Sequence, residues 1–248
     1  MLAASVPTTA PPLSGIDPGT LPDVWRASEL ARSRSPAAST GYPALDRELP
    51  NGGWPQSSLT ELLLQQHGIG ELQLLRPMLA RLARSQRIAL VQPPCIPQAM
   101  AARHWDVDPH HLLWLRPASG ADALWSAEQI LKNGSCGALL LWQTQIRAES
   151  LRRLHLAAQG SETWFWLLRP MAAALEPSPA PLRLGLRPAQ GGAVVEILKR
   201  RGPAADDHLF LPLPHMPARR PTTETDHAIA VQPVPAAAAA ASAAPLLV

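Results

Sequence analysis

The segment Leu59-Thr60-Glu61-Leu62-Leu63-Leu64-Gln65-Gln66-His67-Gly68-Ile69-Gly70-Glu71-Leu72 decides the fold class of this chain. Its first six residues form an apolar run of strand length. After the turn, leucines at 72, 75, 79 and 82 recur at the three- and four-residue spacing of a helix with one buried face. A strand that passes through a glycine-containing turn into a helix predicts the first unit of an α/β fold.

The alternation of strand and helix continues on the C-terminal side of this segment. Strands are predicted at residues 87–91, 112–115, 138–142 and 163–168, and helices at 98–103, 120–131 and 148–159. The strands are continuous apolar runs, which is typical of strands that a parallel sheet buries on both faces beneath crossover helices. After Pro170, residues 182–186 and 193–199 flank Gln190-Gly191-Gly192, which predicts an antiparallel hairpin at the edge of the sheet.

The two ends of the chain have a different composition. Residues 1–20 are rich in Pro, Ala, Ser and Thr and have no apolar periodicity, so we expect a disordered arm. Asp23 can cap a short helix that ends near Ala31. Residues 217–248 have spaced prolines and a run of six alanines, and we expect a second disordered tail. One α/β domain is therefore expected over residues 21–216.

Composition and charge limit the class of protein. A hydrophobic content of 46% in 248 residues is enough for a buried core. The net charge of +3 is compatible with weak contact to DNA, but no clustered basic face is evident. Cys95 and Cys136 have no metal-ligand spacing and are too few for a secreted disulfide scaffold. Neither a signal peptide nor an apolar run long enough to span a membrane is present, so we expect a cytoplasmic location.

The turn after residue 64 is the position at which a nucleotide-binding α/β protein holds phosphate. Such a turn is glycine-rich and ends in Gly-Lys-Ser/Thr, because the lysine neutralises phosphate and the hydroxyl holds magnesium. This chain keeps Gly68 and Gly70, but Glu71 replaces the lysine and Leu72 replaces the hydroxyl. The sequence therefore predicts a degenerate loop that binds no nucleotide cofactor.

The residues that lead into this turn resemble those before the nucleotide loop of RecA-type recombinases. They are Thr40-Gly41, Leu45-Asp46, Leu49, Gly52-Gly53, Pro55 and Glu61. The resemblance covers roughly residues 37–200 and includes Ala102-Arg103, Val107-Asp108, Leu112-Leu113 and Leu151-Arg152-Arg153-Leu154. It implies a RecA-like, mostly parallel sheet with crossover helices and a C-terminal antiparallel hairpin.

The same resemblance implies two carboxylates that this chain lacks. The RecA-like pattern places a metal-linked acid at the end of the fourth strand, where this chain has Trp142. It places a water-activating glutamate just after the second strand, where this chain has Pro94 or its neighbour Cys95. Phosphoryl transfer depends on positioning and electrostatics, so the loss of the lysine and both acids predicts a protein that is not an enzyme.

Two bacterial families with a RecA-like core of this kind share further motifs with the chain: ImuA, an accessory of damage-induced translesion synthesis, and SulA, a cell division inhibitor. The shared motifs lie at residues 68–72, 114–117, 121–129 and 139–142. The length of the chain and its extension past the fifth strand favour ImuA. That resemblance implies a non-catalytic subunit that binds ImuB, an inactive Y-family polymerase relative, and works with RecA and a DnaE-type error-prone polymerase. The SulA resemblance implies instead binding to a tubulin-like division protein.

Candidate partner-binding residues follow from residue type. Trp and Arg are enriched at the centres of protein interfaces, and the chain has eight tryptophans. Packing in the core is the first expectation for the tryptophans, and Trp54 and Trp105 are the ones favoured as surface anchors if some of them lie at an interface. The basic run Lys199, Arg200 and Arg201 marks a second candidate surface, with a solvated strand end as the alternative. The histidines near residue 110 lack a metal-ligand spacing, and no nucleophile elbow of a hydrolase is present.

Overall fold

The structure, a computed structural model, describes residues 36–98, 102–103, 105–202 and 208–213. The predicted arm at residues 1–20, the short helix from Asp23 and the predicted tail at residues 217–248 lie outside the described residues. So do residues 99–101 of the helix predicted at 98–103. The remaining elements can be compared with the sequence one by one.

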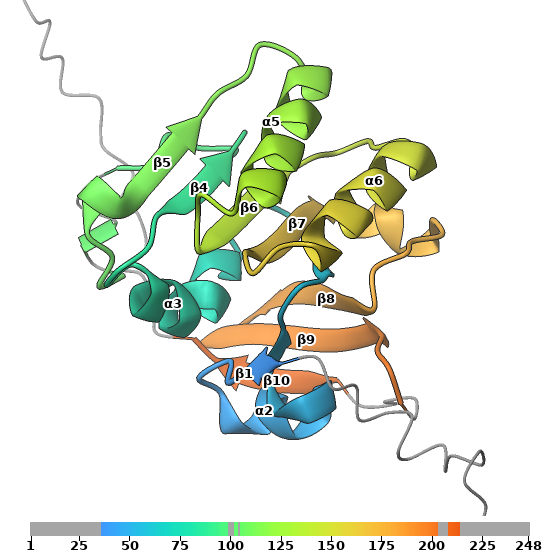
Figure 1. Cartoon of the computed structure of the whole chain (residues 1–248). Coiled ribbons are helices and arrows are strands. Elements are labelled where there is room, and N and C mark those ends of the chain that lie inside the picture. The colour runs from blue at the N-terminus through green and yellow to red at the C-terminus, as the bar shows by residue number, and fades with distance from the viewer. Residues whose placement is uncertain (1–35, 99–101, 104, 203–207, 214–248) are drawn as a thin grey trace, which may run out of the picture. The chain divides into compact units, whose positions relative to one another are not determined.

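An eight-stranded sheet forms the centre of the described part of the chain (Figure 1). Its strands are β3 (Leu59–Leu64), β4 (Ile88–Val91), β5 (Leu112–Leu115), β6 (Ala138–Trp142), β7 (Trp164–Pro170), β8 (Leu182–Ala189), β9 (Gly192–Lys199) and β10 (Leu209–Pro212). They lie in the order β10-β9-β8-β3-β7-β6-β4-β5. The pairs from β8 across to β5 are parallel, and β8, β9 and β10 pair antiparallel. The predicted α/β class with a mostly parallel sheet is confirmed.

Helices cover both faces of the sheet. The structure has α2 (Pro43–Glu48), α3 (Glu71–Leu82), α5 (Gly120–Asn133), α6 (Ala148–Gln159) and the short 3-10 helices η2 (Pro50–Gly52), η3 (Pro109–His111) and η4 (Met171–Leu175). The buried face of α3 packs on one side of the sheet, and those of α5 and α6 pack on the other. A small antiparallel pair, β1 (Ala37–Ala38) and β2 (Trp54–Pro55), precedes β3. Within the described residues, no helix has the length and apolar character needed to cross a membrane.

The predicted antiparallel hairpin is confirmed, but it does not form the edge of the sheet. Strands β8 and β9 meet at a two-residue turn in which Gly191 has a φ of +77°, a conformation that favours glycine. The strand β10, which the sequence did not predict, pairs with β9 and becomes the edge on this side. β10 is four residues long, and a run that short has no periodicity by which to identify it.

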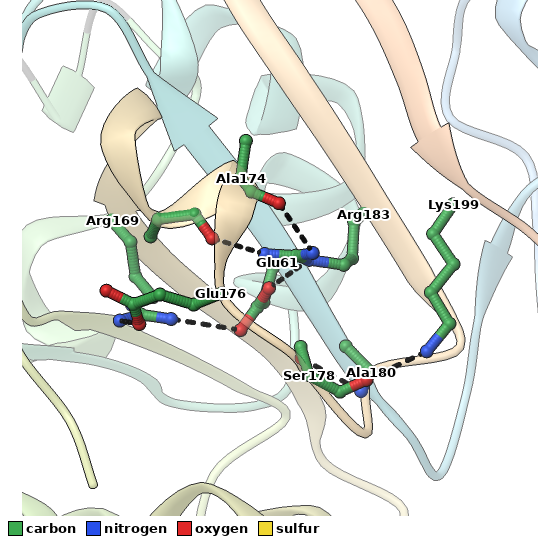
Figure 2. A network of polar contacts seen from close by, with 9 residues as sticks. Glu61, Arg169, Ala174, Glu176, Ser178, Ala180, Arg183 and Lys199 are labelled. Atoms are coloured by element: carbon green, nitrogen blue, oxygen red, sulfur yellow. Dashed lines mark hydrogen bonds and ion pairs between the residues drawn. The ribbon is translucent and has the colours of Figure 1, made fainter. Parts of the chain in front are cut away.

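A network of buried charges crosses the middle of the sheet (Figure 2). Arg183 on β8 donates from its Nε to Oε2 of Glu61 on β3 at 2.6 Å. Nη1 of Arg169 on β7 lies 3.6 Å from the other oxygen of Glu61. The side chains of Glu61 and Arg169 are fully buried, and that of Arg183 is 8% exposed. Because Leu62 and Leu64 face α3, these charges lie on the opposite face of the sheet.

The 3-10 helix η4 and Glu176, which follow β7, complete this network. The backbone oxygens of Ala173 and Ala174 accept hydrogen bonds from Arg183 at 2.7 Å and 3.3 Å. The carboxylate of Glu176 accepts a hydrogen bond from Arg169 at 2.6 Å. Two arginines therefore face two carboxylates, and the crossover from β7 to β8 is fixed over the sheet by polar contacts (Figure 2).

Replacing Glu61 with glutamine should strongly destabilise the fold. The change leaves the buried guanidinium groups without their central counter-charge, for which we expect a loss of about 3–5 kcal/mol in the free energy of unfolding. The matched control is Glu196→Gln, since Glu196 forms a partly exposed ion pair with Arg187 at 3.6 Å. That control should cost less than about 1 kcal/mol. Urea unfolding measures both, and equal losses would contradict a special role for Glu61.

Candidate functional site

The turn between β3 and α3 holds its own carboxylate. Oε1 of Glu71, the first residue of α3, accepts a hydrogen bond from the backbone N–H of Gly68 at 2.9 Å. Glu71 is 4% exposed, and its Oε2 is buried without a hydrogen-bond partner among the described residues. A carboxylate is favourable at this position, because the amino end of a helix carries a partial positive charge. The Gly68 amide, which could otherwise bind the anion of a ligand, is thus hydrogen-bonded to the carboxylate of Glu71.

Gly70 lies against Leu213, the residue that follows the last strand of the sheet. Its φ of +112° lies in the left-handed region, and a Cβ built on it would be 2.6 Å from Cδ1 of Leu213. Leu213 follows β10 directly and is 8% exposed. The turn is therefore covered on one side by an apolar side chain from a distant part of the sequence.

A pocket of about 380 Å³ opens at the carboxyl ends of β4, β5, β6 and β7. In an open α/β sheet, ligands bind in this position. Its lining includes His67, Gln92, Pro94, Arg116, Trp142 and Gln143. Among the described residues that line it, Arg116 and His67 are the groups that can carry a positive charge, and none is Asp or Glu.

Both positions at which the resemblance implies a missing acid line this pocket. Trp142 is the last residue of β6 and is 5% exposed, whereas Pro94 is exposed in the segment after β4. Between them, Gln143 donates a hydrogen bond from its Nε2 to Oε1 of Gln92 at 2.5 Å. An indole, a proline ring and two amides therefore occupy the region in which a metal-dependent site would need carboxylates.

The structure separates the other residues of the predicted degenerate loop from this pocket. Gly68, Gly70, Glu71 and Leu72 do not line it, although His67 of the same turn does. Leu72 is partly buried and packs against the core below α3. Within the described residues, no three His, Cys, Asp or Glu side chains come close enough together to hold a metal ion.

The two tryptophans favoured as surface anchors have different surroundings. Trp54 is 0% exposed and packs edge-to-face on Trp166 at 5.8 Å between ring centroids, so its side chain belongs to the core and not to a binding surface. Trp105 is partly buried against the same core. Aromatic residues suit cores and interfaces equally, and residue type alone therefore could not place Trp54.

The basic run at the end of β9 lies at the other end of the sheet. Lys199 pairs with Arg183 near the start of β8, so it marks the amino ends of the parallel strands. Lys199 and Arg201 are exposed, whereas Arg200 is partly buried and forms an ion pair with Glu48 at 3.1 Å. Burial, followed by the charges of Lys199 and Arg201, lowers the pKa of His155 below its ordinary value. This region is positively charged but remote from the pocket.

Sequence reasoning missed Arg116 and His67 as site residues. Each follows a predicted strand directly or within a few residues, and the carboxyl ends of parallel strands meet at one edge of the sheet. That position is the signal by which they could have been found. The sequence did not predict which strands are neighbours in the sheet. For example, β4 and β6 pair although more than forty residues separate them in the chain.

A scan against protein-family models finds no match to this chain, and a search of curated proteins finds none either. Functional conclusions therefore rest on the residues and geometry described above.

Substituting Gly70 with alanine should destabilise the protein more than the same change at Gly68. Both glycines have a positive φ, which alone costs alanine about 1–2 kcal/mol. Only at Gly70 does the added methyl group collide with Leu213, for which overpacking adds about 1–3 kcal/mol. The free energy of unfolding measures the difference, and in a double-mutant cycle with Leu213→Ala the combined loss should be smaller than the sum of the two single losses. Equal losses at both glycines would show that Leu213 does not cover the turn.

Proposed function

We propose that this chain is an ImuA-type, RecA-like domain that has lost ATP hydrolysis and acts as a non-catalytic accessory protein in damage-induced translesion DNA synthesis. The main support for the proposal is the set of residues that occupies the turn and the pocket where a RecA-type protein would bind its nucleotide. Glu71 fills the turn with a buried carboxylate, and Trp142 and Pro94 occupy the positions of the expected acids.

The RecA-like assignment is supported by the role of the residues that lead into the turn. The backbone N–H of Thr40 donates to Oδ1 of Asp46 at 2.7 Å, which closes the start of α2. Gly41 has a φ of +87°, and a Cβ on it would lie 2.5 Å from Cβ of Pro77 in α3. The Tyr42 hydroxyl donates to the backbone oxygen of Gln73 at 2.9 Å. The residues that carry the resemblance thus belong to a unit that positions α3.

The order of the parallel strands excludes two common arrangements of an α/β sheet. From β3 through β7 in chain order, the five parallel strands lie as 3-2-4-5-1. Two arrangements are common in doubly wound sheets, 3-2-1-4-5-6 and 2-1-3-4-5. Both place the first strand next to the second, which is not the case in this sheet. Here the first strand, β3, lies beyond the fifth and also pairs with β8.

The chemistry of the site supports a non-catalytic role. ATP hydrolysis needs cationic groups on the phosphates, ligands for magnesium and a residue that orients water. In this chain the turn carries a negative charge at Glu71, and the pocket lining offers Arg116 and His67 but no carboxylate. The turn therefore repels phosphate, and the described residues that line the pocket offer a magnesium ion no carboxylate ligand.

The partners follow from the ImuA resemblance. They are an ImuB-like inactive Y-family polymerase, RecA and a DnaE-type error-prone polymerase, with at most weak contact to DNA. A RecA-like core without catalysis can contribute to such an assembly by presenting a rigid surface.

The chain should therefore co-purify with an inactive Y-family polymerase encoded in the same genome. Deleting its gene should abolish damage-induced mutagenesis without blocking cell division, because a non-catalytic adaptor acts through its partner alone. Pull-down from damage-treated cells and mutation-frequency assays measure the two effects. If overexpression instead produces long undivided cells with an unchanged mutation frequency, the SulA-type function replaces the one proposed here.

A further inference from the structure

The pocket at the carboxyl ends of β4 to β7 has the charge and hydrogen-bonding groups of an anion site. Arg116 brings a guanidinium group and His67 an imidazole from separate segments, and the side chains of Gln92, Gln143 and Thr144 add amide and hydroxyl groups. Since no Asp or Glu is found among its described lining residues, a negative group that enters the pocket meets no like charge there.

An exposed apolar strand edge continues from the pocket. Arg116 directly follows β5, which pairs only with β4 among the described strands and is an edge of the sheet. Trp114 is 41% exposed and precedes Arg116 by two residues, so that the two side chains leave the chain on the same face. Leu113 is 37% exposed on the other face of the same strand. Tryptophan and arginine are both enriched among the residues that contribute most binding energy at the centres of protein interfaces.

We propose that Arg116, His67 and Trp114 form a docking site for an acidic side chain of a protein partner, which enters the pocket without a metal ion. The neighbouring segment of that partner lies along the edge strand β5 and covers Trp114, as extended peptides do on open sheet edges. The identity of the partner as the inactive polymerase rests on the proposed function, whereas the anion site itself does not.

The structure favours a protein over a nucleic acid as the source of the anion. A nucleic acid strand needs a track of several cationic groups, because its affinity comes from many phosphate contacts. Here one arginine and one histidine converge on one pocket, and an apolar strand edge continues from it. One carboxylate flanked by apolar residues matches that arrangement.

The anion site can be tested with small probes on the full chain. N-acetyl-glutamate N-methylamide should shift the indole N–H resonance of Trp142 and the amides of Gln92 and Thr144 in a saturable way. The neutral glutamine analogue should produce no such shifts, since only the charge differs. If both analogues act alike, or if neither acts, the proposal is wrong.

Substitutions then test whether Arg116 binds the glutamate probe. Arg116→Gln should weaken binding of the glutamate probe about tenfold, because it removes a charge-assisted hydrogen bond. Arg152→Gln is the matched control, since Arg152 is exposed on α6 and does not line the pocket, and should leave the affinity unchanged. Displacement of the glutamate probe by a short thymidine oligonucleotide at lower concentration would overturn the choice of a protein ligand.

A third experiment measures binding of the full chain to the inactive polymerase. Trp114→Ala and Arg116→Gln should each weaken binding to the inactive polymerase at least tenfold, whereas Trp125→Ala should not. Trp125 is the matched control because it is 62% exposed but lies on α5. Normal binding by both test variants would overturn the docking site while leaving the proposed function intact. Absence of binding by the unaltered chain would instead count against the proposed function, and the probe experiments would still decide on the anion site.

Discussion

The described fold depends on one buried carboxylate. Glu61 lies in the interior of β3 and must be compensated there, since an unpaired charge in a protein core is strongly unfavourable. Its partners, Arg169 and Arg183, come from the two strands that flank β3. Arg183 is directly paired with Glu61 in the β3–β8 register. A shift of either flanking strand by one residue would turn its arginine to the opposite face, so the ion network fixes the register of three strands.

The position of the candidate site follows from that arrangement. Three residues after Glu61, β3 ends and the turn with Gly68 and Glu71 begins, while β7 and β6 bring Leu168 and Trp142 to the same end of the sheet. A nucleotide site built on this frame would need positive charge in the turn and carboxylates in the pocket. The chain has an acid in the turn, and the described lining of the pocket includes Arg116 and His67 but no carboxylate. Both proposals, a lost ATPase activity and an anion site in the pocket, rest on this distribution of charge.

The sequence predicted the elements better than their neighbours in space. Apolar runs and helical spacing located the strands from β3 to β9 and the helices α3, α5 and α6, because both signals are local. The short strand β10 and the pairing of Arg183 with Glu61, 122 residues apart in the chain, have no local signal. Residue type left both a core and an interface position open for Trp54, because an indole fits either, and only the packing on Trp166 places it in the core. Arg116 lay within a motif used for the resemblance, but its role depends on which strands are adjacent.

The central claim, that Glu71 keeps nucleotides out of the β3–α3 turn, is tested most directly by NMR on the full chain. The backbone amide resonances of Gly68 and Gly70 would be followed while magnesium-bound ATP is added to millimolar concentration. With the Gly68 amide already bonded to Glu71, both resonances should stay in place. Saturable shifts of these two amides, abolished by removing magnesium, would contradict the account.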